Sequence, residues 1–461
     1  MKEDEEEEQI IKKDPVLNRD ELGKNSNKKK KFLYFSLLSC LIIIIIVIFL
    51  IISLTYGNSA KADKGEKANL FKVKYYTFEE NTYLKLFSSY ILKSISSMII
   101  DEQIINNENI DNLYIFNSPG EHSITIQLNE TLNSMQELFK DCSYLTEVDL
   151  SELETKDVNS TAEMFYRCGA LSKINLNNID TRLLNNMTKM FFGCESLTSI
   201  DLSNFNTSKV LDMSGLFNGC YNLQNINLKK LDASSVEDMN NMFSSCITLK
   251  IINFEKFKTK KVKNMSKMFY RCYTLVSLDI SSFSTSEVIT MEGMFQFCTG
   301  LSNLNLKNFD TSKVTDMNNM FSACKGLISV DLSSFNTKQV NNMNNMFNGC
   351  FLLQEINLKS FNTDNLKQMG MMFYGCLSVS NLNISNFKTN NVGNMGGLFG
   401  KCLSLEKIDI RNFNSSGLLS KNNLFSEIGE HGEIYYNSKI FNVSLFNYDI
   451  IKDWKKIDVS K

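Results

Sequence analysis

GCESLTSIDLSNFNTSKVLDMSGLFNGC, the stretch from Gly193 to Cys220, begins and ends on Gly-Cys, so its two cysteines define a 26-residue period. The same interval separates eleven of the twelve cysteines of the chain. They are Cys142, Cys168, Cys194, Cys220, Cys246, Cys272, Cys298, Cys324, Cys350, Cys376 and Cys402. A period of this length, kept without insertion or deletion, is typical of architectures built from stacked repeats. The sequence therefore predicts eleven stacked coils over residues 142–417.

Other residue types recur at fixed distances from each cysteine, and we number these positions +1 to +25. Apolar residues occupy +3, +6, +8, +11, +16, +19, +22 and +23, while Asp or Asn stands at +7. Apolar residues at +6 and +8 around a polar +7 have the period of a strand with one buried face. The spacing by three in the second half is that of a short helical or 3₁₀ turn. We therefore expect an α/β-type repeat solenoid with a parallel sheet on one face and short helical or 3₁₀ turns on the other.

The recurring cysteine fits an inward position of each coil, because free cysteine behaves as a small buried apolar residue. Zinc sites need clustered ligands, and the chain has only His122 and His431 to add to cysteines that stand singly. Disulfides between adjacent coils are not excluded by distance, but parallel side chains on successive rungs point the same way. We expect thiols, no metal site and no cofactor.

Threonine stands at +13 in nearly every coil, where the chain leaves the sheet. Its hydroxyl can form hydrogen bonds with backbone groups of the turn or of the next rung.

The residues at +5, +7 and +9 should point outward, because +6 and +8 point inward. This is the surface that a solenoid commonly offers to partners. Aspartates at +7 never occupy adjacent coils, and each lysine at +9 could reach an aspartate on a neighbouring rung. A self-compensating ladder and a mixed-charge docking stripe are both compatible with this pattern. The candidate partner-binding residues are Asp201, Lys229, Asp279, Lys307, Asp331 and Lys359.

Residues 32–54, FLYFSLLSCLIIIIIVIFLIISL, contain no charge and are long enough to span a bilayer as one helix. Lys28 to Lys31 precede them directly, so the positive-inside rule predicts a cytosolic N-terminus and an exoplasmic repeat region. Residues 1–31 are then a disordered, charged cytosolic tail, and residues 55–70 a polar stalk.

The ends of a solenoid need caps, and residues 71–141 and 418–461 are the candidates. The C-terminal one contains the only tryptophan, Trp454. Asn-x-Ser/Thr sites fit an exoplasmic location if glycans are attached there. The candidate glycosylation sites are Asn129, Asn159, Asn206, Asn383, Asn414 and Asn442; two further sites, Asn186 and Asn264, lie within the packed turn.

The repeat unit CxSLTxIDLSxFNTSxVxxMxxMFxxC resembles that of the BspA-like leucine-rich repeat surface proteins of bacteria and microbial eukaryotes. The copy DLSSFNTKQVNNMNNMFNGC, from Asp331 to Cys350, carries the motif most clearly. The resemblance covers residues 135 to about 425 and implies a right-handed leucine-rich-repeat solenoid. Characterised members of that family imply adhesion to host proteins or to other cells. An N-terminal anchor in place of a far-end attachment module favours a eukaryotic setting.

Charge and repetition limit the function classes. A net charge of −2 without a basic stripe beside exposed aromatics argues against nucleic-acid binding. An enzyme would need an irregular cleft with residues that occur once, so we expect no catalytic residue, although some luminal enzymes share this anchor-and-stalk layout. The expected function is recognition or adhesion of an extracellular or luminal protein or glycan, at the plasma membrane in preference to internal membranes. A structural role in a surface coat is the alternative.

Overall fold

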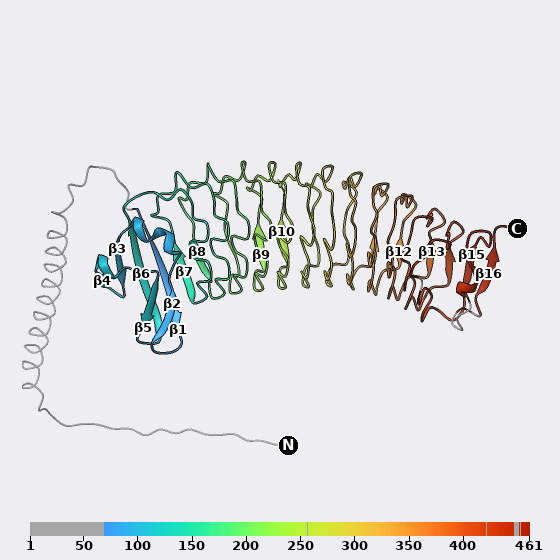
Figure 1. The fold of residues 1–461 in the computed structure, drawn as a ribbon, viewed down its shortest axis with the longest axis horizontal. Helices are drawn as coiled ribbons and strands as arrows, with labels where there is room; N and C mark the ends of the chain where they lie inside the picture. Colours follow the sequence, from blue (N-terminus) through green and yellow to red (C-terminus); the bar gives the residue numbers. More distant parts are fainter. Residues whose placement is uncertain (1–68, 256, 421, 447–450, 452) are drawn as a thin grey trace, which may run out of the picture. The chain divides into compact units, whose positions relative to one another are not determined.

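The computed structural model describes residues 69–255, 257–420, 422–446, 451 and 453–461. All of them belong to one compact unit, Lys67–Lys461, whose coils stand side by side in a single row (Figure 1). The expected cytosolic tail, the membrane-spanning segment and most of the stalk lie outside the described residues. Within the described ranges, no helix combines the length and the apolar character needed to cross a membrane.

The N-terminal end of the unit is an antiparallel sheet that continues into the coil stack. Its strands are β1 (Leu70–Thr77), β3 (Ile95–Ile100), β4 (Gln103–Ile105) and β6 (Gly120–Leu128), followed by β7 (Leu145–Asp149) and β8 (Lys173–Asn175), in the order β4-β3-β6-β1-β7-β8. A separate pair, β2 (Thr82–Lys85) and β5 (Leu113–Phe116), and two 3₁₀ helices, η1 (Ser89–Ser94) and η2 (Asn107–Asn109), complete this end. Val73 of β1 faces Ile124 on one side and Val148 of the first coil on the other. Strand β1 therefore occupies the hydrogen-bonding edge of the first rung.

Parallel strands run through the first half of the coils, as the two-residue period predicted. The pairs are β9 (Asn225–Asn227) with β10 (Ile251–Asn253), β11 (Ser329–Val330) with β12 (Glu355–Ile356), and β13 (Asn381–Asn383) with β14 (Lys407–Asp409). Partners occupy the same position of successive coils, as Ile226 and Ile252 do. The strands are very short and occur in separate sheets, so the expected parallel sheet is interrupted along the described stack.

The second half of each coil is not helical, and the expected helical or 3₁₀ turns were wrong. Positions +21 and +25 have positive φ, as at Lys189 (51°) and Gly193 (70°), which a right-handed helix does not allow. The N–H of Phe191 donates to Leu216 O of the next coil at 3.0 Å instead of to a group in its own coil. The spacing by three therefore comes from successive tight turns, such as Met190 N–H to Met187 O at 3.2 Å.

The interior is a set of columns of identical side chains. The eleven repeated cysteines are free thiols and all are buried, as expected. Each from Cys168 onward donates its Sγ–H to the carbonyl of the phenylalanine 29 residues earlier, for example from Cys220 to Phe191 O at 3.1 Å. Burial raises the pKa of the Cys272 thiol to about 12. Beside this column, phenylalanine rings at +23 stack on one another, with Phe191 and Phe217 5.5 Å apart between centroids.

The threonine column joins neighbouring coils through a reciprocal hydrogen bond. Thr311 Oγ1 accepts the N–H of Asn336 at 2.9 Å and donates to the carbonyl of the same residue at 2.9 Å. The same pair of bonds recurs at Thr207, Thr259, Thr285, Thr337, Thr363 and Thr389. Ala233 takes the +13 position in one coil and has no hydroxyl to offer. Threonine therefore satisfies a peptide group in the next coil, which is why it recurs.

We expect Thr311→Val to lower the free energy of unfolding by about 1–3 kcal/mol, because the peptide of Asn336 loses both partners. Ala233→Thr should raise it by about 1 kcal/mol, since a hydroxyl there can bind the peptide of Lys258. Urea unfolding monitored by circular dichroism measures both changes. Thr315→Val makes the same chemical change at a half-buried hydroxyl with one long hydrogen bond, of 3.3 Å, and should have little effect. Equal losses for Thr311→Val and Thr315→Val would contradict the proposed role.

The C-terminal end extends the stack beyond the last cysteine. Ile428 lies 26 residues after Cys402 and so occupies the position that a twelfth repeated cysteine would have. Phe425 continues the phenylalanine column and stacks on Phe399, with ring centroids 5.5 Å apart. Strands β15 (Glu433–Tyr436) and β16 (Lys455–Asp458) then add two parallel rungs to β14, with the 3₁₀ helix η3 (Val443–Phe446) between them. Trp454 is buried and donates its Nε1–H to Gly429 O at 2.7 Å. This tryptophan therefore packs over the end of the repeated region.

Candidate functional site

The six candidate partner-binding residues lie on the strand half of the coils, at +7 and +9. Asp201, Asp279, Asp331, Lys307 and Lys359 are exposed, and Lys229 is half-buried. Apolar neighbours at +8, such as Leu202 and Leu332, are buried. The alternation inferred from the sequence therefore presents these charges to solvent along one face of the stack.

The +7 side chains also have a structural role that the sequence analysis missed. Asp279 Oδ1 accepts the backbone N–H of Ser281 at 3.0 Å, and hydrogen bonds from Ser281 hold the pKa of this carboxyl below its usual range. Asn305 Oδ1 accepts the N–H of Lys307 in the same way, at 3.2 Å. Both Asp and Asn occur at +7 because either can supply the oxygen that ends the strand in an Asx turn. That hydrogen bond, and not charge alone, accounts for the residue type.

The expected pairing of +9 lysines with aspartates on neighbouring rungs is met only in part. Hydrogen bonds from Ser333 and, to a smaller extent, the nearby ammonium of Lys307 lower the pKa of the Asp331 carboxyl, but the two side chains form no ion pair. Lys229 pairs with Glu255, at 2.6 Å, and Lys307 and Lys359 form no ion pair with a described carboxylate. The carboxylates of Asp279 and Asp331 accept backbone N–H groups within their own turns, and neither forms an ion pair with a +9 lysine. Both lysines therefore remain available to a partner.

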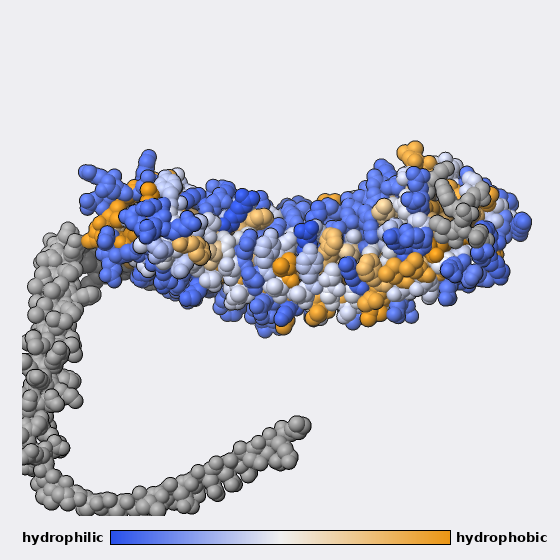
Figure 2. Space-filling model, turned by 90° about the horizontal axis from the view of Figure 1, so that it is seen from below, coloured by the Kyte–Doolittle hydropathy of each residue, from blue (hydrophilic) through white to orange (hydrophobic). Residues whose placement is uncertain are grey.

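Four exposed apolar side chains occupy positions +1, +4 and +5 of the coils that begin at Cys220, Cys246 and Cys272, and we call them the apolar row. Ile251, in β10, is 63% exposed, and Val276, in the first half of the next coil, is 57% exposed. Tyr221 and Tyr273, at +1 of nearby coils, are exposed as well. Grouped exposed apolar residues with a polar border are typical of interaction sites. Figure 2 shows such apolar patches between hydrophilic areas on one face of the unit.

A second apolar group follows farther along the stack. Ile328, Phe351 and Leu352 are exposed, and the Lys325 ammonium lies 5.2 Å from the centre of the Phe351 ring. Tyrosine and phenylalanine anchors contribute strongly to protein interfaces when a partner buries them. These positions vary from coil to coil, so the repeat pattern gives no sign of them.

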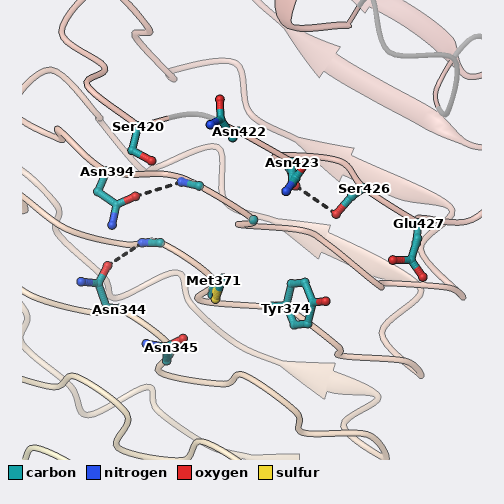
Figure 3. A pocket seen from close by; sticks show the side chains of 13 residues that line it. Asn344, Asn345, Met371, Tyr374, Asn394, Ser420, Asn422, Asn423, Ser426 and Glu427 are labelled. Atoms are coloured by element: carbon teal, nitrogen blue, oxygen red, sulfur yellow. Dashed lines mark hydrogen bonds between the residues drawn. The ribbon is translucent and has the colours of Figure 1, made fainter.

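The turn half of the last coils contains a polar cavity of about 560 Å³ (Figure 3). Asn344 Oδ1 accepts the N–H of Gly370 at 2.7 Å, and Asn394 Oδ1 accepts that of Gly396 at 3.0 Å. Tyr374 and Glu427 also line the cavity. The hollow depends on glycine, since a Cβ on Gly397 would lie 3.1 Å from Met371 Cγ. The cavity offers hydrogen-bonding groups to a ligand.

In the N-terminal cap a carboxylate, an imidazole and a hydroxyl lie in contact in the same sequence as the three groups of a catalytic triad. His122 Nδ1 lies 2.6 Å from Asp101 Oδ2, and its Nε2 lies 3.2 Å from Thr77 Oγ1. Thr77 is fully buried, so a substrate cannot reach its hydroxyl. The imidazole also stacks on Phe116 at 4.0 Å. This group joins strands and turns of the cap, and we interpret it as structural.

The candidate glycosylation sites are distributed over the described surface. Asn129, Asn159, Asn206, Asn383 and Asn442 are exposed, and Asn414 is half-buried. In the described part of the chain, no group of three or more His, Cys, Asp or Glu side chains could hold a metal ion.

Comparison with known proteins finds a repeat family. The family model described as "Mycoplasma protein of unknown function, DUF285" matches residues 133–251, 247–355, 326–433 and 351–456, more than half of the chain. The chain matches none of the curated proteins.

Two solved structures are examples of those to which this chain is similar. One is the TLR13 chain of a TLR13–ssRNA13 complex, with 13% identity and a TM-score of 0.22 over 66% of this chain and 51% of that one. The other is a leucine-rich repeat protein of Leptospira interrogans, with 15% identity and a TM-score of 0.19 over 60% of this chain and 84% of that one. The chain thus spans about half of the TLR13 chain that it matches.

Proposed function

Because the chain belongs to the family described as Mycoplasma protein of unknown function, DUF285, and forms a repeat solenoid, we propose that it is a recognition protein of the BspA-like type. Repeat solenoids of this kind commonly serve as interaction modules. In this proposal residues 32–54 anchor the chain in a membrane, residues 1–31 face the cytosol, and the right-handed coil stack binds a partner outside the cell. Attachment of the cell to a protein ligand is then the biological result.

The observation that carries the proposal is the row of exposed apolar side chains beside the charged stripe. Burying Ile251, Val276 and the two tyrosines against a partner would remove apolar surface from water, at about 25 cal/mol per Å². Lys307 and Asp331, close by on the same half of the coils, would form the polar rim that favours one partner over another. A protein ligand provides both kinds of contact.

The test replaces the apolar row without changing the fold. We expect Ile251→Glu with Val276→Glu in the full chain, in detergent micelles, to weaken binding to a purified extracellular protein at least tenfold. A tenfold change corresponds to about 1.4 kcal/mol, and two unpaired charges buried at an interface cost more than that. Ligands are found first with an array of purified extracellular proteins, and Kd is then measured by surface plasmon resonance.

The matched control is Leu211→Glu with Ile289→Glu, which adds the same charges at exposed apolar residues of the +17 position. Its affinity should remain that of the unchanged chain. If both variants bind equally well, the strand face is not the site. If the array yields no ligand and the first variant instead abolishes association between copies of the chain, a surface coat is the better explanation.

A further inference from the structure

Lysines concentrate in two neighbouring coils of a chain whose net charge is only −2. Residues 229–263 contain eight lysines against four acidic residues. The lysines are Lys229, Lys230, Lys250, Lys256, Lys258, Lys260, Lys261 and Lys263. This part of the chain is therefore strongly basic, although the whole chain is close to neutral.

Four of these lysines line one open cleft of about 920 Å³. Lys229 and Lys230 come from one coil, and Lys258 and Lys260 from the next. The two coils are adjacent, because β9 and β10 pair in parallel. The rest of the lining is small or polar, apart from Leu231, and Asp232 supplies its single carboxylate.

Three of the four lysines have no partner of opposite charge among the described residues. Lys229 pairs with Glu255, and outside the cleft Lys263 pairs with Glu237. Lys230, Lys258 and Lys260 are exposed and form no ion pair with a described carboxylate. The Asp232 carboxylate already accepts the N–H of Ser234 at 2.9 Å. The cleft therefore carries positive charge that the described residues do not neutralise.

The composition of the lining indicates which anion fits. Lysine ammonium groups attract anions as point charges and do not impose the planar, two-bond geometry of arginine. The lining contains no aromatic side chain on which a nucleic-acid base could stack. An open cleft lined by flexible cations suits a linear chain that carries anionic groups at intervals.

We propose that the cleft between these two coils binds a sulfated linear polysaccharide, with Lys230, Lys258 and Lys260 contacting its sulfate groups. The inference depends on the exoplasmic location in the proposed function, because such polysaccharides occur outside the cell. It does not depend on the apolar row, which a different set of residues forms.

The test measures binding of heparin to the full chain in detergent micelles. In 50 mM NaCl the unchanged chain binds heparin, and binding weakens steeply in 500 mM NaCl because salt screens exposed charges. Lys230→Glu, Lys258→Glu and Lys260→Glu together reduce the affinity about a hundredfold, since three attractions become repulsions. N- and O-desulfated heparin does not bind.

The control variant combines Lys93→Glu, Lys338→Glu and Lys439→Glu, which are exposed lysines outside the cleft. It has the same net charge as the cleft variant and keeps the affinity of the unchanged chain. Equal losses in the two variants, or no heparin binding by the unchanged chain, would overturn the proposal. So would tighter, cleft-dependent binding of polyuridylate or of phosphatidylserine vesicles than of heparin. Binding of a protein ligand is tested separately, by the substitutions at Ile251 and Val276. A failure of the polysaccharide proposal can therefore be distinguished from a failure of the proposed function.

Discussion

Removal of residues 272–297 should leave a folded protein that is shorter by one coil. The deletion joins Arg271 to Cys298 and keeps every later residue at its position in the repeat. Phe269 then comes next to Phe321, and both rings belong to the same stacked column. Each coil contacts mainly its neighbours, so one fewer coil lowers stability without removing the fold. The shortened chain should keep a cooperative unfolding transition and unreactive thiols.

Removal of residues 272–284 should abolish the fold, although it deletes half as many residues. It joins Arg271 to Thr285, so the turn half of one coil follows directly on another and one strand rung is lost. The columns of cysteine, threonine and phenylalanine beyond the junction can no longer align with those before it. Circular dichroism during urea unfolding and reaction of the thiols with a chromogenic disulfide compare the two deletions. Similar behaviour of both would rule out stacking in fixed register.

Alkaline pH should unfold the protein within a narrow range. Burial raises the thiol pKa in the folded state from its ordinary value of 9.0 to about 12 for Cys272 and for Cys324. A raised pKa in the folded state means that stability is fully present below pH 9 and is lost as the pH rises toward 12. At pH 10 each thiol that ionises only on unfolding lowers the free energy of unfolding by about 1.4 kcal/mol. Eleven such thiols, one from each coil, act in the same direction.

The measurement is urea unfolding at pH 8, 9 and 10, together with thiolate absorbance near 240 nm. A Cys40→Ser chain restricts the signal to the repeated cysteines. Thiolate should appear only with unfolding, and Cys298→Ala should reduce the number of protons released by one. Constant stability from pH 8 to pH 10, or gradual ionisation in the folded state, would contradict the buried column.

The sequence predicts the parts of the fold that depend on burial. The 26-residue period and the alternation around +7 correctly place the buried thiols and the parallel strands. The turn half was misread because apolar residues spaced by three suit both a helix and a series of tight turns. The difference lies in positive φ at +21, which Asn241 and several glycines of that column favour but which Lys189 gives no sign of. The hydrogen bonds from N–H groups of one coil to carbonyls of the next form only when the coils stack, so the sequence of a single coil does not reveal them.

The surface was predictable only where it repeats. Asp279 and Lys307 could be placed on an exposed face because the apolar residues at +6 and +8 recur in every coil. Ile251, Val276 and the lysines of the cleft occupy positions whose residue type changes between coils, so a consensus repeat hides them. Whether these residues form a shared surface depends on neighbours that are a full coil away in the chain, and only the stacked structure brings them together.

The closed ends of the stack keep the protein from growing into a fibre. Rungs this regular, with unpaired backbone groups at each end, could otherwise recruit further copies edge to edge, as amyloid does. Strand β1 runs antiparallel across the first rung and so interrupts any parallel addition there. At the other end Lys455 and Lys456 stand exposed on β16, and lysines on a strand edge disfavour the pairing of another strand. Both features disfavour edge-to-edge addition of further copies.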